Sequence, residues 1–115
     1  HGQAVVHADP DRVEQILTNL LDNALEASTP PGEVVVRAFW EGEEMVLEVL
    51  DRGPGLPVED PELLFQPFFS SKGRGSGVGL AVVLRIVTDH GGTVRLEPRE
   101  GGGVRAVVRI PGGEP

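Results

Sequence analysis

The chain has 115 residues, the size of one ordinary domain, and its 39% apolar and 24% charged residues are typical of a globular protein with a buried core. A formal net charge of -8 argues against non-specific binding to nucleic acid or an anionic membrane. The absence of cysteine excludes disulfides, thiol catalysis and cysteine-ligated metals. No apolar run approaches the roughly 20 residues of a membrane helix, so we expect a cytoplasmic domain, whatever anchor the full-length protein carries.

The first part of the chain predicts a short strand followed by a long helix. Residues 3 to 8 read as the strand, and Asp9 with Pro10 starts the helix, because a carboxylate caps free N–H groups and proline suits the first turn. The helix extends to about residue 28. Because the strand begins almost at the first residue, we expect a single domain, residues 1 to 115, cut from a longer protein. The apolar stripe of the helix is Val13, Ile16, Leu17, Leu20, Leu21, Ala24 and Leu25.

Two β-rich runs, 33–40 and 44–51, predict an antiparallel hairpin around Gly42. Side chains alternate between the two faces of a strand, so Asp51 shares the core-facing side of the second run, whereas Glu48 points to the other face. A core-facing carboxylate is unusual, because burying a charge is costly unless hydrogen bonds compensate it.

The second half of the chain predicts one helical turn at 62–65, a buried helix at about 78–90, and a second hairpin with strands at 93–98 and 103–110. Strands and helices in this order predict a two-layer α/β sandwich, in which one mixed β-sheet carries about three helices on a single face.

Three polar patterns are candidates for a site. Asn19 and Asn23 lie four residues apart on the first predicted helix, which is either a solvated face or a pair of neutral oxygen ligands for Mg²⁺. The Asp-x-Gly-x-Gly sequence that begins at Asp51 is either a turn or the floor of a pocket for a flat base, with the carboxylate accepting an exocyclic amine.

The third pattern is a glycine-rich run, Gly-x-Gly-x-Gly from Gly75, directly before the buried helix. It is either a flexible connection or a phosphate site, because a helix N-terminus offers unpaired N–H groups and the positive end of a dipole. Lys72, the only lysine in the chain, lies in the same loop and suits a terminal phosphate.

Taken in order, these motifs resemble the ATP-binding domain of the GHKL superfamily, most closely the catalytic domain of bacterial sensor histidine kinases. NLLDNALEA at 19–27 resembles the N box, DRGPGL at 51–56 the G1 box, FQPFFSSK at 65–72 the F box, and GSGVGL at 75–80 the G2 box. The resemblance covers essentially the whole chain and implies a Bergerat-type fold. It departs from many members at Glu26, where a basic residue is common.

The resemblance also implies roles for individual residues. Asn23 would ligate Mg²⁺, with Asn19 assisting directly or through water, and Asp51 would receive the adenine amine of ATP. Lys72 would contact the γ-phosphate. The base pocket would be lined by Gly53, Gly55 and Leu56. The phosphates would be covered by the glycine-rich lid and the helix start, at Gly75, Gly77, Val78, Gly79 and Leu80.

The resemblance implies a partner as well. Kinases of this kind transfer the γ-phosphate to a histidine on a separate dimerisation domain, and a response regulator acts downstream. None of His1, His7 and His90 has the setting of a phosphoacceptor, so the attacked histidine is expected outside this chain, and the isolated domain is expected to be monomeric. The alternatives are an anti-sigma-factor-type serine kinase and a non-catalytic binding module of the same fold.

Overall fold

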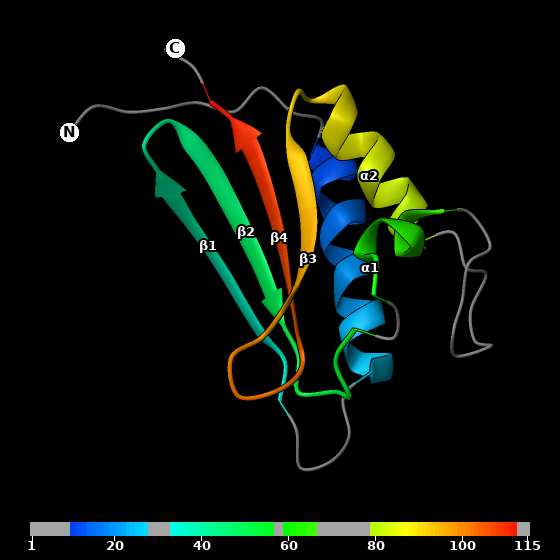
Figure 1. Ribbon diagram of the computed structural model, residues 1–115. Coiled ribbons are helices and arrows are strands. Elements are labelled where there is room, and N and C mark those ends of the chain that lie inside the picture. The colour runs from blue at the N-terminus through cyan, green and yellow to red at the C-terminus, as the bar shows by residue number, and fades with distance from the viewer. Residues whose placement is uncertain (1–9, 28–32, 57–58, 67–78, 113–115) are drawn as a thin grey trace.

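The protein forms two layers, a four-stranded sheet and a layer of helices. The computed structural model describes residues 10–27, 33–56, 59–66 and 79–112. In this part of the chain all helices lie on one face of the sheet, and the opposite face carries none (Figure 1). Neither α-helix described is long and apolar enough to cross a membrane. The two-layer α/β arrangement is therefore the one that the sequence predicts.

The sheet consists of two antiparallel hairpins placed side by side. The strand order is β1-β2-β4-β3, and each neighbouring pair is antiparallel. Both predicted hairpins are confirmed. The strand predicted at residues 3 to 8 lies outside the described residues, and within them no parallel pair makes the sheet mixed. The strands are β1 (Val35–Glu41), β2 (Glu44–Leu50), β3 (Thr93–Pro98) and β4 (Val104–Pro111).

The long helix α1 (Pro10–Ala27) packs against the second α-helix and against β2. Ile16, Leu20 and Ala24 are its most buried apolar side chains, because their spacing places them on one side of the helix. Leu25 is the exception in the predicted stripe: its side chain is 62% exposed, since it lies at the edge of that stripe in the last helical turn.

Two further helical segments complete this layer. The first, η1 (Pro61–Phe65), is a 3-10 helix whose N-terminus is capped by the Asp60 carboxylate, and it buries Phe65 in the core. The second, α2 (Gly79–Asp89), is an α-helix that packs against α1, η1 and β3. The expectation of about three helices is thus met in part, by two α-helices and one short 3-10 helix in the described chain.

A tight turn connects α2 to β3. The N–H of Gly92 donates to the carbonyl of Val87 at 2.9 Å, and Gly91 has the left-handed φ of 73° that glycine adopts most readily at a helix end. Nδ1 of His90 donates to the carbonyl oxygen of Ile86 at 2.7 Å. His90 therefore has a structural role in this turn.

Gly92 is expected to tolerate no side chain. A Cβ atom at this position would overlap the backbone carbonyl oxygen of Arg109 on β4. We expect Gly92→Ala to lower the free energy of unfolding in urea by about 2 kcal/mol, because the two backbones must move apart. Gly42→Asn is the matched control: a Cβ there meets open space, and asparagine tolerates its φ of 63°. Equal losses in both variants would contradict the role given to Gly92.

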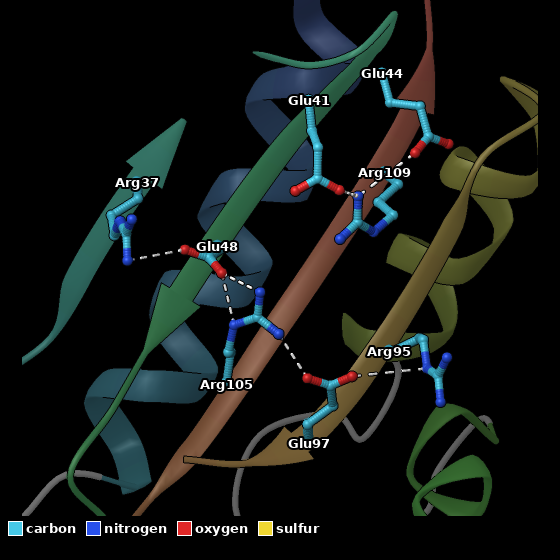
Figure 2. A network of polar contacts seen from close by, with 8 residues as sticks. All are labelled: Arg37, Glu41, Glu44, Glu48, Arg95, Glu97, Arg105 and Arg109. Atoms are coloured by element: carbon cyan, nitrogen blue, oxygen red, sulfur yellow. Dashed lines mark hydrogen bonds and ion pairs between the residues drawn. The ribbon is translucent and has the colours of Figure 1, made fainter. Parts of the chain in front are cut away.

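The helix-free face of the sheet carries a network of ion pairs (Figure 2). Its centre is Glu48, whose side chain is almost fully buried and accepts hydrogen bonds from Arg105. Arg105 also donates to Glu97 at 2.6 Å. Burial alone would lower the pKa of the Arg105 guanidinium, but the hydrogen bonds to Glu48 and Glu97 outweigh it and the pKa is raised. Arg105 therefore stays charged wherever the protein is folded.

A second group in Figure 2 is centred on Arg109, which pairs with Glu41 at 2.6 Å and with Glu44 at 3.5 Å. The hydrogen bond to Glu41 is the main reason that the pKa of Arg109 is raised. Because this group is more exposed than Glu48, solvent screens it more strongly. The two groups together explain how four arginines and four glutamates share one sheet face. Those eight residues are Arg37, Glu41, Glu44, Glu48, Arg95, Glu97, Arg105 and Arg109.

Candidate functional site

Asp51 is the most unusual residue on the helix side of the sheet. It directly follows β2 and is only 3% exposed, which confirms its predicted core-facing position. Its Oδ1 atom accepts hydrogen bonds from the backbone N–H groups of Gly53, at 2.9 Å, and Val104, at 3.0 Å. Both of these bonds end on Oδ1, and no described residue donates a hydrogen bond to the second oxygen, Oδ2. The carboxylate is thus fixed by one oxygen, while the other is available to a donor from outside.

The turn after Asp51 is built by glycine. The N–H of Gly53 holds the carboxylate, and Gly55 has a φ of 95°, a backbone conformation that side chains disfavour. A Cβ atom on Gly55 would meet no other atom within 4 Å. The turn geometry therefore explains this glycine by itself, and the lining role predicted for Gly53 and Gly55 stays a prediction. Leu56 packs against the core and anchors the end of the turn.

Asn19, the first residue of the predicted asparagine pair, lies at the start of α2. Asn19 and Asn23 are half-buried on α1. A Cβ atom built on Gly79, the first residue of α2, would lie 3.7 Å from Oδ1 of Asn19. The structure thus brings the amide oxygen of Asn19 close to the N-terminus of α2, where the glycine-rich motif ends. Leu80, the next residue, packs against the core and holds this helix start in place.

The donors near this helix start fit a cation that is shared with a phosphate. Among the described residues, no group of three or more histidine and acidic side chains could hold a metal by itself. Neutral amide oxygens at Asn19 and Asn23 are hard ligands that leave several positions of Mg²⁺ to phosphate oxygens and water. This donor set suits magnesium that arrives with a nucleotide.

Four predicted site residues, Lys72, Gly75, Gly77 and Val78, lie outside the described residues, so their roles stay predictions.

Sequence reasoning also missed one contributor to the site. Arg99, in the loop between β3 and β4, and Val104, the first residue of β4, both contact Asp51. The signal that could have revealed this loop is the run of three glycines at 101–103, since such a run indicates a tightly folded loop.

The family comparison agrees with this arrangement. The family described as "Histidine kinase-, DNA gyrase B-, and HSP90-like ATPase" matches residues 8–114. The chain belongs to this family. The match spans both described halves of the site, the α1 asparagines and the Asp51 turn, and it confirms the resemblance predicted from the four motifs.

Individual relatives are histidine kinases. The chain is 41% identical over 106 residues to "Sensor histidine kinase ZraS" of Escherichia coli O157:H7, covering 92% of this chain and 23% of that protein. The chain thus spans about a quarter of the length of this relative. It is also 38% identical over 113 residues to the circadian input-output histidine kinase CikA of Synechococcus elongatus, covering 93% of this chain and 15% of that protein.

Solved structures share the fold. The nucleotide-free catalytic domain of histidine kinase ThkA superposes with a TM-score of 0.83 at 37% identity, covering 92% of this chain and 70% of that one. Full-length ShkA in complex with AMPPNP superposes with a TM-score of 0.85 at 28% identity, covering 98% of this chain and 24% of that one. AMPPNP is an ATP analogue, so one structure of this similarity was solved with a nucleotide.

Proposed function

We propose that this chain is the catalytic and ATP-binding domain of a sensor histidine kinase. It would hold Mg·ATP and present the γ-phosphate to a histidine on a separate dimerisation and phosphotransfer domain. The observation that carries the proposal is the buried Asp51 carboxylate, fixed through Oδ1 and with Oδ2 left available. A carboxylate in this nearly buried position is stabilised by hydrogen-bond donors, and the exocyclic amine of adenine would supply one to Oδ2.

The phosphates would lie at the other described part of the site. The N-terminus of α2 offers N–H groups and a partial positive charge to anionic oxygens. Asn23 and Asn19 would hold the Mg²⁺ that neutralises phosphate charge. Lys72 and the glycine-rich lid would cover the γ-phosphate. In this proposal the protein supplies mainly position and charge, which is what phosphoryl transfer demands.

The reaction would be an in-line displacement at the γ-phosphorus. A ring nitrogen of the acceptor histidine attacks, a P–N bond forms, and the bond from the γ-phosphorus to the bridging oxygen of ADP breaks. ADP leaves with the bonding electron pair, and the attacking imidazole gives up its N–H proton to solvent. The chain's own side chains hold the donor in line and are not themselves modified.

Two alternative functions differ from this proposal in what happens to the γ-phosphate. A serine kinase of the anti-sigma-factor type would phosphorylate a hydroxyl, and a non-catalytic module would bind a partner without transfer. Neither is favoured, because the relatives described above are histidine kinases and because the Asp51 carboxylate is kept in a binding-ready geometry. We propose that a response regulator acts downstream and that the isolated domain is a cytoplasmic monomer.

The acceptor can be identified directly. The chain is incubated with γ-labelled ATP and the dimerisation domain of its parent protein, and the labelled product is treated with acid and with base. Phosphohistidine is labile in acid and stable in base, whereas phosphoserine shows the opposite behaviour. Label that survives acid would overturn the proposed acceptor, and absence of label with intact ATP binding would favour the non-catalytic module.

Asn23 provides a test of the magnesium assignment. We expect Asn23→Ala to weaken Mg·ATP binding about tenfold or more, because a metal ligand is lost. Binding of ATP in the presence of EDTA is expected to change less than about twofold. Calorimetric titration under both conditions measures this difference. Gln15→Ala removes an exposed amide from the same helix and is the matched control. Equal losses with and without magnesium would contradict the assignment.

A further inference from the structure

Asp51 and the residues from Arg99 to Val104 form hydrogen bonds that differ from those of a regular antiparallel pair: a side chain replaces a backbone group on each side. The β2–β4 ladder ends at Leu50 and Arg105, so Asp51 and Val104 form the next pair. The N–H of Asp51 donates to the carbonyl of Val104 at 3.0 Å, as in a regular antiparallel pair. The returning bond is different, because the N–H of Val104 donates to Oδ1 of the Asp51 side chain, also at 3.0 Å.

This exchange leaves the backbone carbonyl of Asp51 without its ladder donor. Nη1 of Arg99 supplies the replacement and donates to this oxygen at 3.1 Å. A buried carbonyl without a donor is costly, so the Arg99 guanidinium stabilises the arrangement in which Val104 serves the carboxylate. Arg99 therefore acts on the orientation of the Asp51 side chain through the Asp51 backbone.

The loop is shaped for this contact. The N–H of Arg99 donates to the carbonyl of Gly103 at 2.9 Å, and the N–H of Gly102 donates to the carbonyl of Arg99 at 3.0 Å, so the loop closes on Arg99. Gly103 has a φ of 101°, and a Cβ atom there would overlap the Asp51 carbonyl and lie 3.0 Å from Oδ1. Only glycine lets the loop approach Asp51 so closely. Nη1 of Arg52 lies 3.4 Å from the carbonyls of Glu100 and Gly102 on the same loop.

We propose that Arg99 is a positioning residue that sets the Asp51 carboxylate for recognition of a base with an exocyclic amine. This inference rests on the proposed function, which assigns Asp51 to the base. If Arg99 is removed, the N–H of Val104 can return to the Asp51 backbone carbonyl as in a regular ladder. Oδ1 then loses one of its two donors, and the carboxylate can rotate away from the base.

The test compares ATP with purine riboside triphosphate, an analogue that lacks the exocyclic amine. Arg99→Met is expected to weaken ATP binding about tenfold and binding of the analogue less than about twofold, measured by calorimetry on the same chain. Arg99→Lys, which keeps the charge and a donor, is expected to restore part of the ATP affinity. Arg95→Met removes an exposed arginine from the opposite sheet face and is the matched control. It is expected to change neither affinity.

A double variant separates this inference from the proposed function. In the Asp51→Asn background, adding Arg99→Met is expected to change ATP affinity by less than about twofold, because Arg99 acts through the carboxylate. Equal weakening of ATP and the analogue by Arg99→Met, or no weakening of either, would overturn the inference while leaving the Asp51 assignment intact. If Asp51→Asn alone leaves ATP affinity unchanged, the base site itself is wrong. Should Arg99→Met fail to fold, Arg99→Lys carries the same comparison.

Discussion

Replacing Asp51 by asparagine is expected to weaken ATP binding by about 100-fold, which corresponds to about 2.7 kcal/mol. The amide oxygen of the new side chain can still accept the N–H groups of Gly53 and Val104. The amide nitrogen then takes the place of Oδ2, and two N–H donors face each other where the carboxylate would accept the adenine amine. Sites built around a hydrogen bond discriminate strongly because the unpaired group stays buried. Calorimetric titration with Mg·ATP measures the loss.

Glu48→Gln is a close control for this change. Glu48 and Asp51 are both buried carboxylates with 3% exposure, three residues apart, but they lie on opposite faces of the sheet. We expect Glu48→Gln to leave ATP affinity within about twofold of the parent chain. Similar losses in both variants would mean that removing any buried charge disturbs the site. In that case the result would contradict a specific role of Asp51 in binding the base.

The sequence predicts the local parts of this structure well. Residues of α1 and α2 follow a helical period, and those of the strands alternate, so each element is coded within its own segment. The period-two rule even places Asp51 and Glu48 on opposite faces. In the structure Glu48 joins the ion pairs of the helix-free face (Figure 2), whereas Asp51 continues the core-facing positions of β2. Leu25 shows the limit: its spacing suggests burial, but whether another element covers the edge of the stripe depends on tertiary packing.

The contacts between hairpins could not be predicted in the same way. The strand order places β4 beside β2, and only this register brings Arg105 to Glu48 and Val104 to Asp51. These partners are more than fifty residues apart in the chain. The glycine run at 101–103 indicates a tight loop, but nothing local says that the loop closes on Asp51. The site motifs were therefore recognisable, whereas the residues that position them were not.

Replacing Arg105 by methionine is expected to lower the free energy of unfolding by about 3 kcal/mol, because Glu48 remains buried without its main partner. Oε1 of Glu48 accepts no hydrogen bond from the described residues, and its remaining contact is the exposed Arg37 at 3.4 Å. Oε2 would lose both of its contacts with the Arg105 guanidinium. Urea denaturation measures the loss, and ATP affinity of the folded fraction is expected to be unchanged because the site lies on the other face.

A second variant tests whether the cost comes from the stranded charge. Glu48→Leu combined with Arg105→Met removes both members of the pair, and we expect it to recover stability to within about 1 kcal/mol of the parent chain, since apolar side chains pack well between Val46 and Val107 on this face. Arg109→Met is the control for loss of one arginine, and its effect is expected to be much smaller because Glu41 and Glu44 stay solvated. If the double variant is no more stable than Arg105→Met, the loss reflects packing of the arginine stem, and Glu48 carries no buried-charge penalty.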